Sequence, residues 1–191
     1  MENIIRNTTG FAMYMIHGYI RHSSTIVDAT CGNGHDTLSL AQCRPKQLFA
    51  FDIQQKAISE TEQRLRSNGF SEELGNGSIK LICDGHEYID HYISGPVDIA
   101  VFNLGYLPGS DKKCITSASS TISAVKKCLT LLAPGGLISI TMYSGHTGGS
   151  EEKSALLEMA SSLDASEFHV SYVQMLNQHS APPELLLITK K

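Results

Sequence analysis

The sequence predicts an α/β fold in which helices cover both faces of a mostly parallel sheet. Short segments rich in Val, Ile and Leu alternate with helical segments, a pattern typical of a buried parallel sheet. The last two apolar segments are strands without a helix between them, which predicts one antiparallel strand. With 191 residues, of which 41% are hydrophobic, the chain can bury a continuous core. We therefore expect a single domain over residues 1–191.

Hydrophobic spacing and stop signals place the elements. An opening amphipathic helix is expected over residues 4–20, within an N-terminal segment (1–22) that packs on the sheet. Gly69 ends one later helix, and the stretch 133–136 ends another. Strands are predicted over residues 25–30, 47–52, 78–83, 97–103, 137–143, 167–176 and 184–190. The intervening helices are predicted over residues 33–42, 54–69, 86–93, 117–132 and 151–163.

The charge balance limits how the chain can bind a polyanion. Fifteen Lys and Arg residues against nineteen Asp and Glu give a net charge of -4, so no overall basic field attracts nucleic acid. A local basic island between residues 101 and 135 sets one aspartate against four lysines, namely Lys112, Lys113, Lys126 and Lys127. Phosphates are expected to bind this island, although Lys126 and Lys127 fit a solvated helix face equally well.

The cysteines and the N-terminus exclude further classes of protein. The five cysteines are odd in number and contain no C-x-x-C pair, which argues against a disulfide framework and structural zinc. Without a spaced cluster of His and carboxylate residues, no metal is predicted. The N-terminal segment lacks the pattern of a signal peptide or a membrane span. We expect a cytoplasmic protein that binds neither membrane nor DNA.

Glycines and polar residues follow the first two predicted strands, at the edge where open parallel sheets bind ligands. Gly32 and Gly34 allow a tight turn and let a ligand lie against the backbone. Thr37 stands where the third glycine of a dinucleotide fingerprint would be, so a nicotinamide-dependent dehydrogenase is disfavoured. Asp52, at the end of the second strand, is placed to accept both hydroxyls of a ribose, or to cap the next helix.

The next two strands also end in polar residues. Asp84 ends the third strand, where a carboxylate can accept a hydrogen bond from the exocyclic amine of an adenine. Asn103 ends the fourth strand and is followed by Tyr106, which together supply an amide and an aromatic plane. Four polar strand ends in register indicate a ligand site more strongly than any one of them.

This order of motifs resembles the class I S-adenosylmethionine methyltransferases. The resemblance implies a Rossmann-like fold with a seven-stranded sheet whose last strand is antiparallel. It also implies S-adenosyl-L-methionine as cofactor. The residues then expected to bind the cofactor are Asp28, Thr30, Gly32, Asn33, Gly34, Asp36, Asp52, Ile53, Gln54, Asp84, Gly85, His86, Asn103 and Leu104.

A closer resemblance rests on four segments, FNLGYLPGSDK (102–112), LLAPGGLISI (131–140), YSGHTGG (143–149) and NQHSAPPELLLI (177–188). They are similar to a bacterial family of rRNA methylases whose members include tRNA methyltransferases. The resemblance implies methylation of the amine of 5-aminomethyl-(2-thio)uridine at the wobble position, with the anticodon region of tRNA as partner. Ser144 and Thr147 replace prolines usual in that family, which predicts a less stiff loop. An rRNA or small-molecule amine methyltransferase and a non-catalytic cofactor-binding module stay open as alternatives.

The expected chemistry assigns roles at the acceptor side. An alkylamine with a pKa of about 10.4 must lose a proton before it attacks a methyl group. Asn103 can hold the amine through its side-chain oxygen, Tyr106 can stack on the base, and Tyr143 and His146 are the titratable candidates. His146 fits a solvated loop equally well.

Three further residue roles are expected. Besides Lys112 and Lys113, the residues Asn177 and Gln178 are expected to contact the RNA. Cys31 is expected to be a core or turn residue rather than a nucleophile. Apolar side chains on several faces of the opening helix fit a homodimer contact, or equally a lid over the sheet.

Overall fold

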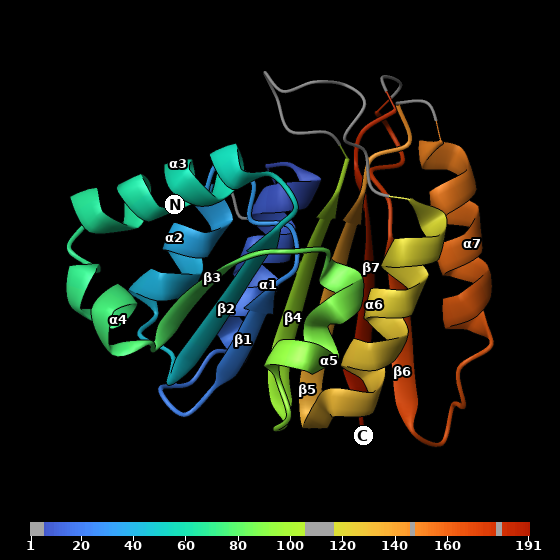
Figure 1. Cartoon of the computed structure of the whole chain (residues 1–191). Coiled ribbons are helices and arrows are strands. Elements are labelled where there is room, and N and C mark those ends of the chain that lie inside the picture. Colours follow the sequence, from blue (N-terminus) through green and yellow to red (C-terminus); the bar gives the residue numbers. More distant parts are fainter. Residues whose placement is uncertain (1–5, 106–116, 146–147, 179–180) are drawn as a thin grey trace.

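A single seven-stranded sheet forms the centre of the protein (Figure 1). The computed structural model describes residues 6–105, 117–145, 148–178 and 181–191. The strands are β1 (Thr25–Asp28), β2 (Gln47–Asp52), β3 (Ile79–Cys83), β4 (Val97–Leu104), β5 (Leu132–Met142), β6 (Phe168–Val173) and β7 (Glu184–Lys190). The helices are α1 (Thr8–Tyr19), α2 (His35–Gln42), α3 (Gln55–Ser67), α4 (Ser71–Asn76), the 3-10 helix η1 (His86–Tyr88), α5 (Ile89–Tyr92), α6 (Ala118–Leu131) and α7 (Gly149–Ser161).

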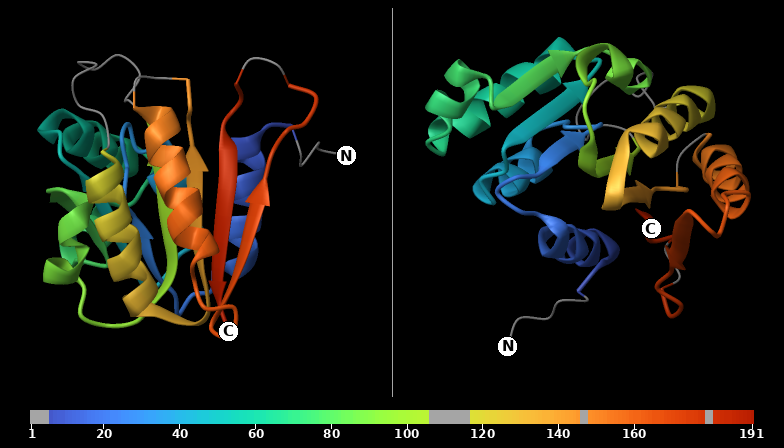
Figure 2. Two further views of the ribbon diagram at one scale, coloured as in Figure 1. Left: turned by 90° about the vertical axis from the view of Figure 1, so that its right-hand side faces the viewer. Right: turned by 90° about the horizontal axis from the view of Figure 1, so that it is seen from below.

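The strand order is β3-β2-β1-β4-β5-β7-β6. The pairs from β3 to β5 are parallel, whereas β7 pairs antiparallel with both β5 and β6. Figure 2 shows β7 pointing opposite to its neighbours. The predicted α/β class, with its seven-stranded sheet and antiparallel last strand, is confirmed.

Helices cover both faces of the sheet, as the view from below shows (Figure 2). Successive strand residues point to opposite faces, so each face has its own apolar core. Ile26 packs in the cluster with α1, α2 and α3, whereas its neighbour Val27 packs in the cluster with α5, α6 and α7. Burial on both faces explains why the strands are nearly continuous apolar runs.

Two helices show how the sequence determines their packing. The residues of α6 that face the sheet recur at helical spacing and are buried, namely Thr121, Ala124, Val125, Cys128 and Leu129. The first turn of α1 is capped by Asn7, whose side chain accepts a hydrogen bond from the backbone N–H of Gly10 at 2.7 Å. Thr8 then donates to the carbonyl of Pro183 at 2.6 Å, which joins α1 to the start of β7. In the structure Ala12 and Ile16 of α1 are buried in the core on this face of the sheet.

Several predicted boundaries are wrong by a few residues. The first strand ends at Asp28 instead of residue 30, and α2 begins at His35 instead of residue 33, because Gly34 takes a left-handed conformation with φ +75° before it. Helix α4 is not predicted from the sequence; it is a short helix of 6 residues between Phe70 and Gly77. Strand β6 ends at Val173, short of residue 176.

The junction between α6 and β5 is the largest departure from the sequence prediction. The stretch 133–136 was expected to be a loop, but β5 begins at Leu132, which pairs with Val97. The register then shifts so that Leu137 pairs with Ile99. A bulge therefore accommodates the proline and glycines within the strand.

No helix in the described part of the chain is long and apolar enough to cross a membrane. In the same residues there is no group of three or more His, Cys, Asp or Glu side chains that could hold a metal ion.

Candidate active site at the carboxyl edge of the sheet

The polar strand ends predicted from the sequence lie along one edge of the sheet. Because β3, β2, β1 and β4 are parallel neighbours, Asp84, Asp52, Asp28 and Asn103 follow one another along this edge. Strand order reverses at β1, which lies between β2 and β4. Ligands of open α/β sheets bind at such a switch point.

Asp28 lies at the base of the turn that leads from β1 to α2. Its side chain is fully buried and accepts hydrogen bonds from Thr37 Oγ1 at 2.6 Å and from the backbone N–H of Thr30 at 3.2 Å. Burial raises the pKa of Asp28 to about 7, and the neighbouring Asp36 and Asp52 add to the effect. The carboxyl group thus shapes the turn from inside, and a direct contact with a cofactor stays a prediction.

The glycine turn is held against α3. Gly34 has φ +75°, and a Cβ atom built on it would lie 2.8 Å from Thr61 Cα, so no larger residue fits. Thr61 donates to the carbonyl of Gly32 at 3.0 Å, and Arg64 Nε donates to the carbonyl of Asn33 at 2.7 Å. Neither Thr61 nor Arg64 is predicted from the sequence. Their spacing of three residues places them on one face of a helix, but it does not show which loop that face contacts.

Asp52 is bound by the backbone of two loops. Its Oδ2 accepts the N–H of Gly32 at 3.1 Å and its Oδ1 accepts the N–H of Gln54 at 2.9 Å. Partial burial raises the pKa of Asp52. Each carboxylate oxygen can accept a second hydrogen bond, so both oxygens can still accept a hydrogen bond from a ribose hydroxyl. Next to it Ile53 is 59% exposed and offers an apolar surface.

The end of β3 carries the acid predicted to meet an adenine. Asp84 Oδ1 accepts the N–H of Gly85 at 2.8 Å, and its Oδ2 accepts the hydroxyl of Tyr92 at 2.8 Å. Tyr92 was not predicted; it comes from α5, eight residues further along the chain. Two donors on different sides hold this carboxylate in one orientation.

His86 is buried behind this edge. Its Nδ1 lies 3.3 Å from the carbonyl of Ala29, and because a carbonyl only accepts, Nδ1 carries the proton. Its Nε2 is buried without a hydrogen-bond partner among the described residues. Burial lowers the pKa of His86, so the ring stays neutral.

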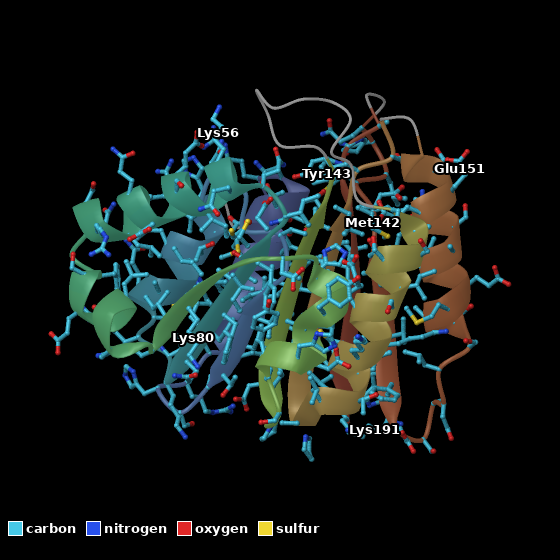
Figure 3. The ribbon with its side chains drawn as sticks, in the orientation of Figure 1. Lys56, Lys80, Met142, Tyr143, Glu151 and Lys191 are labelled. Carbon is cyan, nitrogen blue, oxygen red and sulfur yellow. The ribbon has the colours of Figure 1, made fainter. Side chains whose placement is uncertain are left out.

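Asn103 and Tyr143 form the other side of the site. The backbone N–H of Asn103 donates to Thr30 Oγ1 at 2.7 Å, and its side-chain Nδ2 donates to Asp36 Oδ2. Tyr143 follows β5 directly, at the upper end of the sheet in Figure 3, and is 37% exposed. Burial and the Asp36 charge raise the pKa of Tyr143, which favours its neutral phenol form. The structure therefore brings Asp36, Asn103 and Tyr143 together from three elements.

Leu104 and Cys31 lie in the interior. The Leu104 side chain is buried in the core between the sheet and α6, so only its backbone reaches the edge. Cys31 is buried, and burial raises the pKa of its thiol, which agrees with a turn residue and not a nucleophile.

The remaining predicted site residues fall into two groups. Tyr106, Lys112, Lys113 and His146 lie outside the described residues. Asn177 and Gln178 are exposed in the segment between β6 and β7. The end of β6 and the start of β7 lie at the same edge, because Val173 pairs with Leu185 and Glu184 pairs with Met142.

The basic island is partly engaged within the protein. Lys126 is exposed, but Lys127 Nζ forms an ion pair with Asp90 at 2.6 Å and lies over the ring of Tyr88. Lys127 thus joins α6 to α5. The interpretation of Lys126 and Lys127 as a solvated helix face is therefore wrong for Lys127, which makes a structural contact.

The chain is similar to a known protein family and to solved structures. A family model described as "Putative rRNA methylase" matches residues 48–189. The chain belongs to this rRNA methylase family. Two solved structures have the same fold. The first, from Clostridium thermocellum and called a "putative rRNA-methylase", is 38% identical, with a TM-score of 0.91 over 98% of this chain and 99% of that one. The second, from Streptococcus mutans and called "a putative methyltransferase", was solved in complex with SAH and is 36% identical, with a TM-score of 0.86 over 98% and 99% of the two chains.

A plant relative of this rRNA methylase family member carries a more specific name. The Arabidopsis thaliana protein called tRNA (mnm(5)s(2)U34)-methyltransferase, chloroplastic, is 37% identical over 85% of this chain. The chain spans 62% of the length of that relative. The resemblance to the family and the methyltransferase fold predicted from the sequence are confirmed.

Proposed function

We propose that the chain is an S-adenosylmethionine-dependent methyltransferase that methylates the amine of 5-aminomethyl-(2-thio)uridine at the wobble position of tRNA. The observation that carries this proposal is the convergence of the glycine turn, Asp52 and Asn103 at one edge of the sheet. The SAH in the Streptococcus mutans structure and the name of the Arabidopsis relative support the cofactor and the substrate.

The charges at the edge fit this cofactor. The carboxyl groups of Asp28 and Asp52 lie close enough for their charges to interact, and neither pairs with a Lys or Arg within the described residues. Such a field favours a cation. When bound, S-adenosylmethionine supplies an electrophilic methyl group on a positively charged sulfonium. Asp52 would accept the ribose hydroxyls, and Asp84 the adenine amine.

The acceptor side would prepare the amine. An ammonium with a pKa near 10.4 has no lone pair to donate, so it must first give up a proton. The lone pair freed in this way would form the new N–C bond with the methyl group that bound S-adenosylmethionine would supply, with S-adenosylhomocysteine as the leaving group. Asn103 Oδ1 would hold the free amine by accepting one of its N–H groups. Because Tyr143 stays a neutral phenol, it would act by hydrogen bonding, and His146 is the proposed proton acceptor.

The tRNA would approach from the same edge. Tyr106 would stack on the wobble base, while Lys112, Lys113, Asn177 and Gln178 would contact the anticodon loop. Asn177 and Gln178 are exposed next to the start of β7, which supports this assignment. Neutralised phosphates would make the binding salt-dependent.

The experiment compares methyl acceptors. Labelled S-adenosylmethionine is incubated with the enzyme and with tRNA whose wobble uridine carries the aminomethyl group, with ribosomal RNA, or with a small aminomethyl compound. We expect transfer to the tRNA alone. The family description favours ribosomal RNA as the second candidate, and preferential labelling of ribosomal RNA would replace the tRNA proposal. Cofactor binding without transfer to any acceptor would instead favour a non-catalytic module.

We also propose a homodimer through α1, on which Phe11 and Met13 pack against the core and Tyr14 is 55% exposed. Light scattering of the wild type and of Tyr14→Asp tests it; a monomeric wild type would contradict it.

A further inference from the structure

One hydrogen bond crosses the two sides of the site. Asp36, in the first turn of α2, accepts a hydrogen bond from Nδ2 of Asn103 at the end of β4, although 67 positions separate them in the sequence. From the sequence, Asp36 is predicted to bind the cofactor and Asn103 to hold the methyl acceptor. The contact links these two tasks.

This contact determines how the amide of Asn103 is oriented. An amide group has a donor end and an acceptor end, and only the donor end can bind an ionised carboxylate. With Nδ2 bound to Asp36, Oδ1 is directed away from the carboxylate. Among the described residues none donates a hydrogen bond to Oδ1, which makes this oxygen the acceptor that the described part of the site presents to a ligand.

The backbone of Asn103 is fixed from the same loop. Its N–H donates to Thr30 Oγ1 at 2.7 Å, and Thr30 itself donates its backbone N–H to Asp28. Both ends of the residue are therefore held by the turn after β1 and by α2. We propose that Asp36 is a positioning residue for methyl transfer, which holds the Asn103 amide so that Oδ1 faces the acceptor amine. This inference rests on the proposed function.

The surroundings of Asp36 keep it available for this task. Burial raises the pKa of Asp36, whereas the hydrogen bond from Asn103 and the nearby His35 favour its ionised form. The charge of Asp36 in turn raises the pKa values of Asp28 and Tyr143. Among the described residues no Lys or Arg forms an ion pair with Asp36, so none of them competes with Asn103 for this carboxylate.

The test is a set of variants measured in single turnover at saturating cofactor and tRNA. Asp36→Ala should slow transfer by about 100-fold, because a misplaced acceptor group costs on this order, and should change the cofactor Kd by no more than about threefold. Asp36→Asn should retain most of the rate, since its amide oxygen still accepts from Asn103 Nδ2. Glu72→Gln, at an exposed carboxylate of α4, is the matched control and should leave both values unchanged.

The decisive comparison is a double-mutant cycle. If Asp36 acts through Asn103, then Asp36→Ala adds less than about a twofold loss when Asn103 is already alanine. Losses that multiply would overturn the proposal. It would also be overturned if Asp36→Asn were as slow as Asp36→Ala, which would indicate a proton acceptor, or if cofactor affinity fell while the transfer rate held.

A readout without activity separates this proposal from the proposed function. The side-chain amide resonance of Asn103, assigned by its loss in Asn103→Ala, should shift in Asp36→Ala and much less in Asp36→Asn. An unmoved resonance in Asp36→Ala would overturn the positioning role even in an active enzyme. A shifted resonance in a protein that methylates no RNA would support the contact and reject the proposed function instead.

Discussion

The two halves of the carboxyl edge are built differently. On the β1–β3 half, each half-exposed acid is oriented by neighbours on that half: Asp52 by Gly32 and Gln54, and Asp84 by Gly85 and Tyr92. On the β4–β5 half, Asn103 is oriented by groups from the other half. The proposed cofactor site is therefore preorganised by itself, whereas the acceptor site depends on it. The following variants test this difference.

Asp52→Ala should have the largest effect and should act on the cofactor alone. Two charge-assisted hydrogen bonds to a ribose contribute roughly 1.5–3 kcal/mol each, so the cofactor Kd should rise on the order of 1,000-fold. Titration calorimetry measures this. Retained affinity would remove Asp52 from the ribose site and with it the preorganised half.

Asn103→Ala should show the opposite pattern. Loss of one oriented acceptor should slow methyl transfer by about 100- to 1,000-fold, comparable to the loss of a preorganised polar group in other enzymes. Its cofactor Kd should stay within about threefold of wild type, because the β1–β3 half does not need Asn103. Stopped single turnovers and calorimetry on the same preparation give both values. A joint loss of affinity and rate would mean that the halves are not separable.

Asp28→Asn tests the base of the turn through stability. The ordinary pKa of 3.8 applies to the unfolded chain, whereas burial raises the native value to about 7. Between these values the native state binds more protons, so Asp28 costs stability as the pH rises from about 4 to about 7. The unfolding free energy of Asp28→Asn should therefore rise relative to that of wild type across this pH range, by roughly 4 kcal/mol in total.

Urea denaturation of the ligand-free protein at several pH values measures this gain. Glu72→Gln, which removes an exposed carboxylate, serves as control and should run parallel to wild type. A constant difference between Asp28→Asn and wild type from pH 4 to 8 would contradict the raised pKa.

Gly34→Ala should have the smallest effect, a loss of folding stability. The matched variant Gly69→Ala separates the contribution of the Thr61 contact to this loss. Both Gly34 and Gly69 have positive φ, +75° and +87°, but only Gly34 packs on Thr61, while nothing lies within 4 Å of a Cβ on Gly69. Each alanine should destabilise the fold by about 1 kcal/mol through φ, and Gly34→Ala by about 2 kcal/mol more through overlap. Thermal unfolding of the two variants decides it. Equal losses would show that α3 does not hold the glycine turn.

The same difference between the halves explains what the sequence could predict. The strands, the glycine turn and the acids at 52 and 84 are local features, because a strand, its polar end and the next helix are adjacent in the chain. Gly34 could be predicted as a turn residue, but not the Thr61 contact that forbids a side chain there. Pairing of Asp36 with Asn103 depends on β1 and β4 being neighbours, which sequence spacing does not show. The continuation of β5 through 133–136 was missed because the pairing of Leu132 with Val97 is equally non-local.

The most direct test of the account is mass spectrometry of the wobble nucleoside. tRNA that carries the aminomethyl group but lacks the methyl group is incubated with S-adenosylmethionine and the enzyme, then digested to nucleosides. We predict that the 5-aminomethyl-(2-thio)uridine gains one methyl group on its amine with wild type, and that Asn103→Ala forms this product about 100- to 1,000-fold more slowly. An unchanged wobble nucleoside, or a methyl group on another nucleoside, would contradict the account.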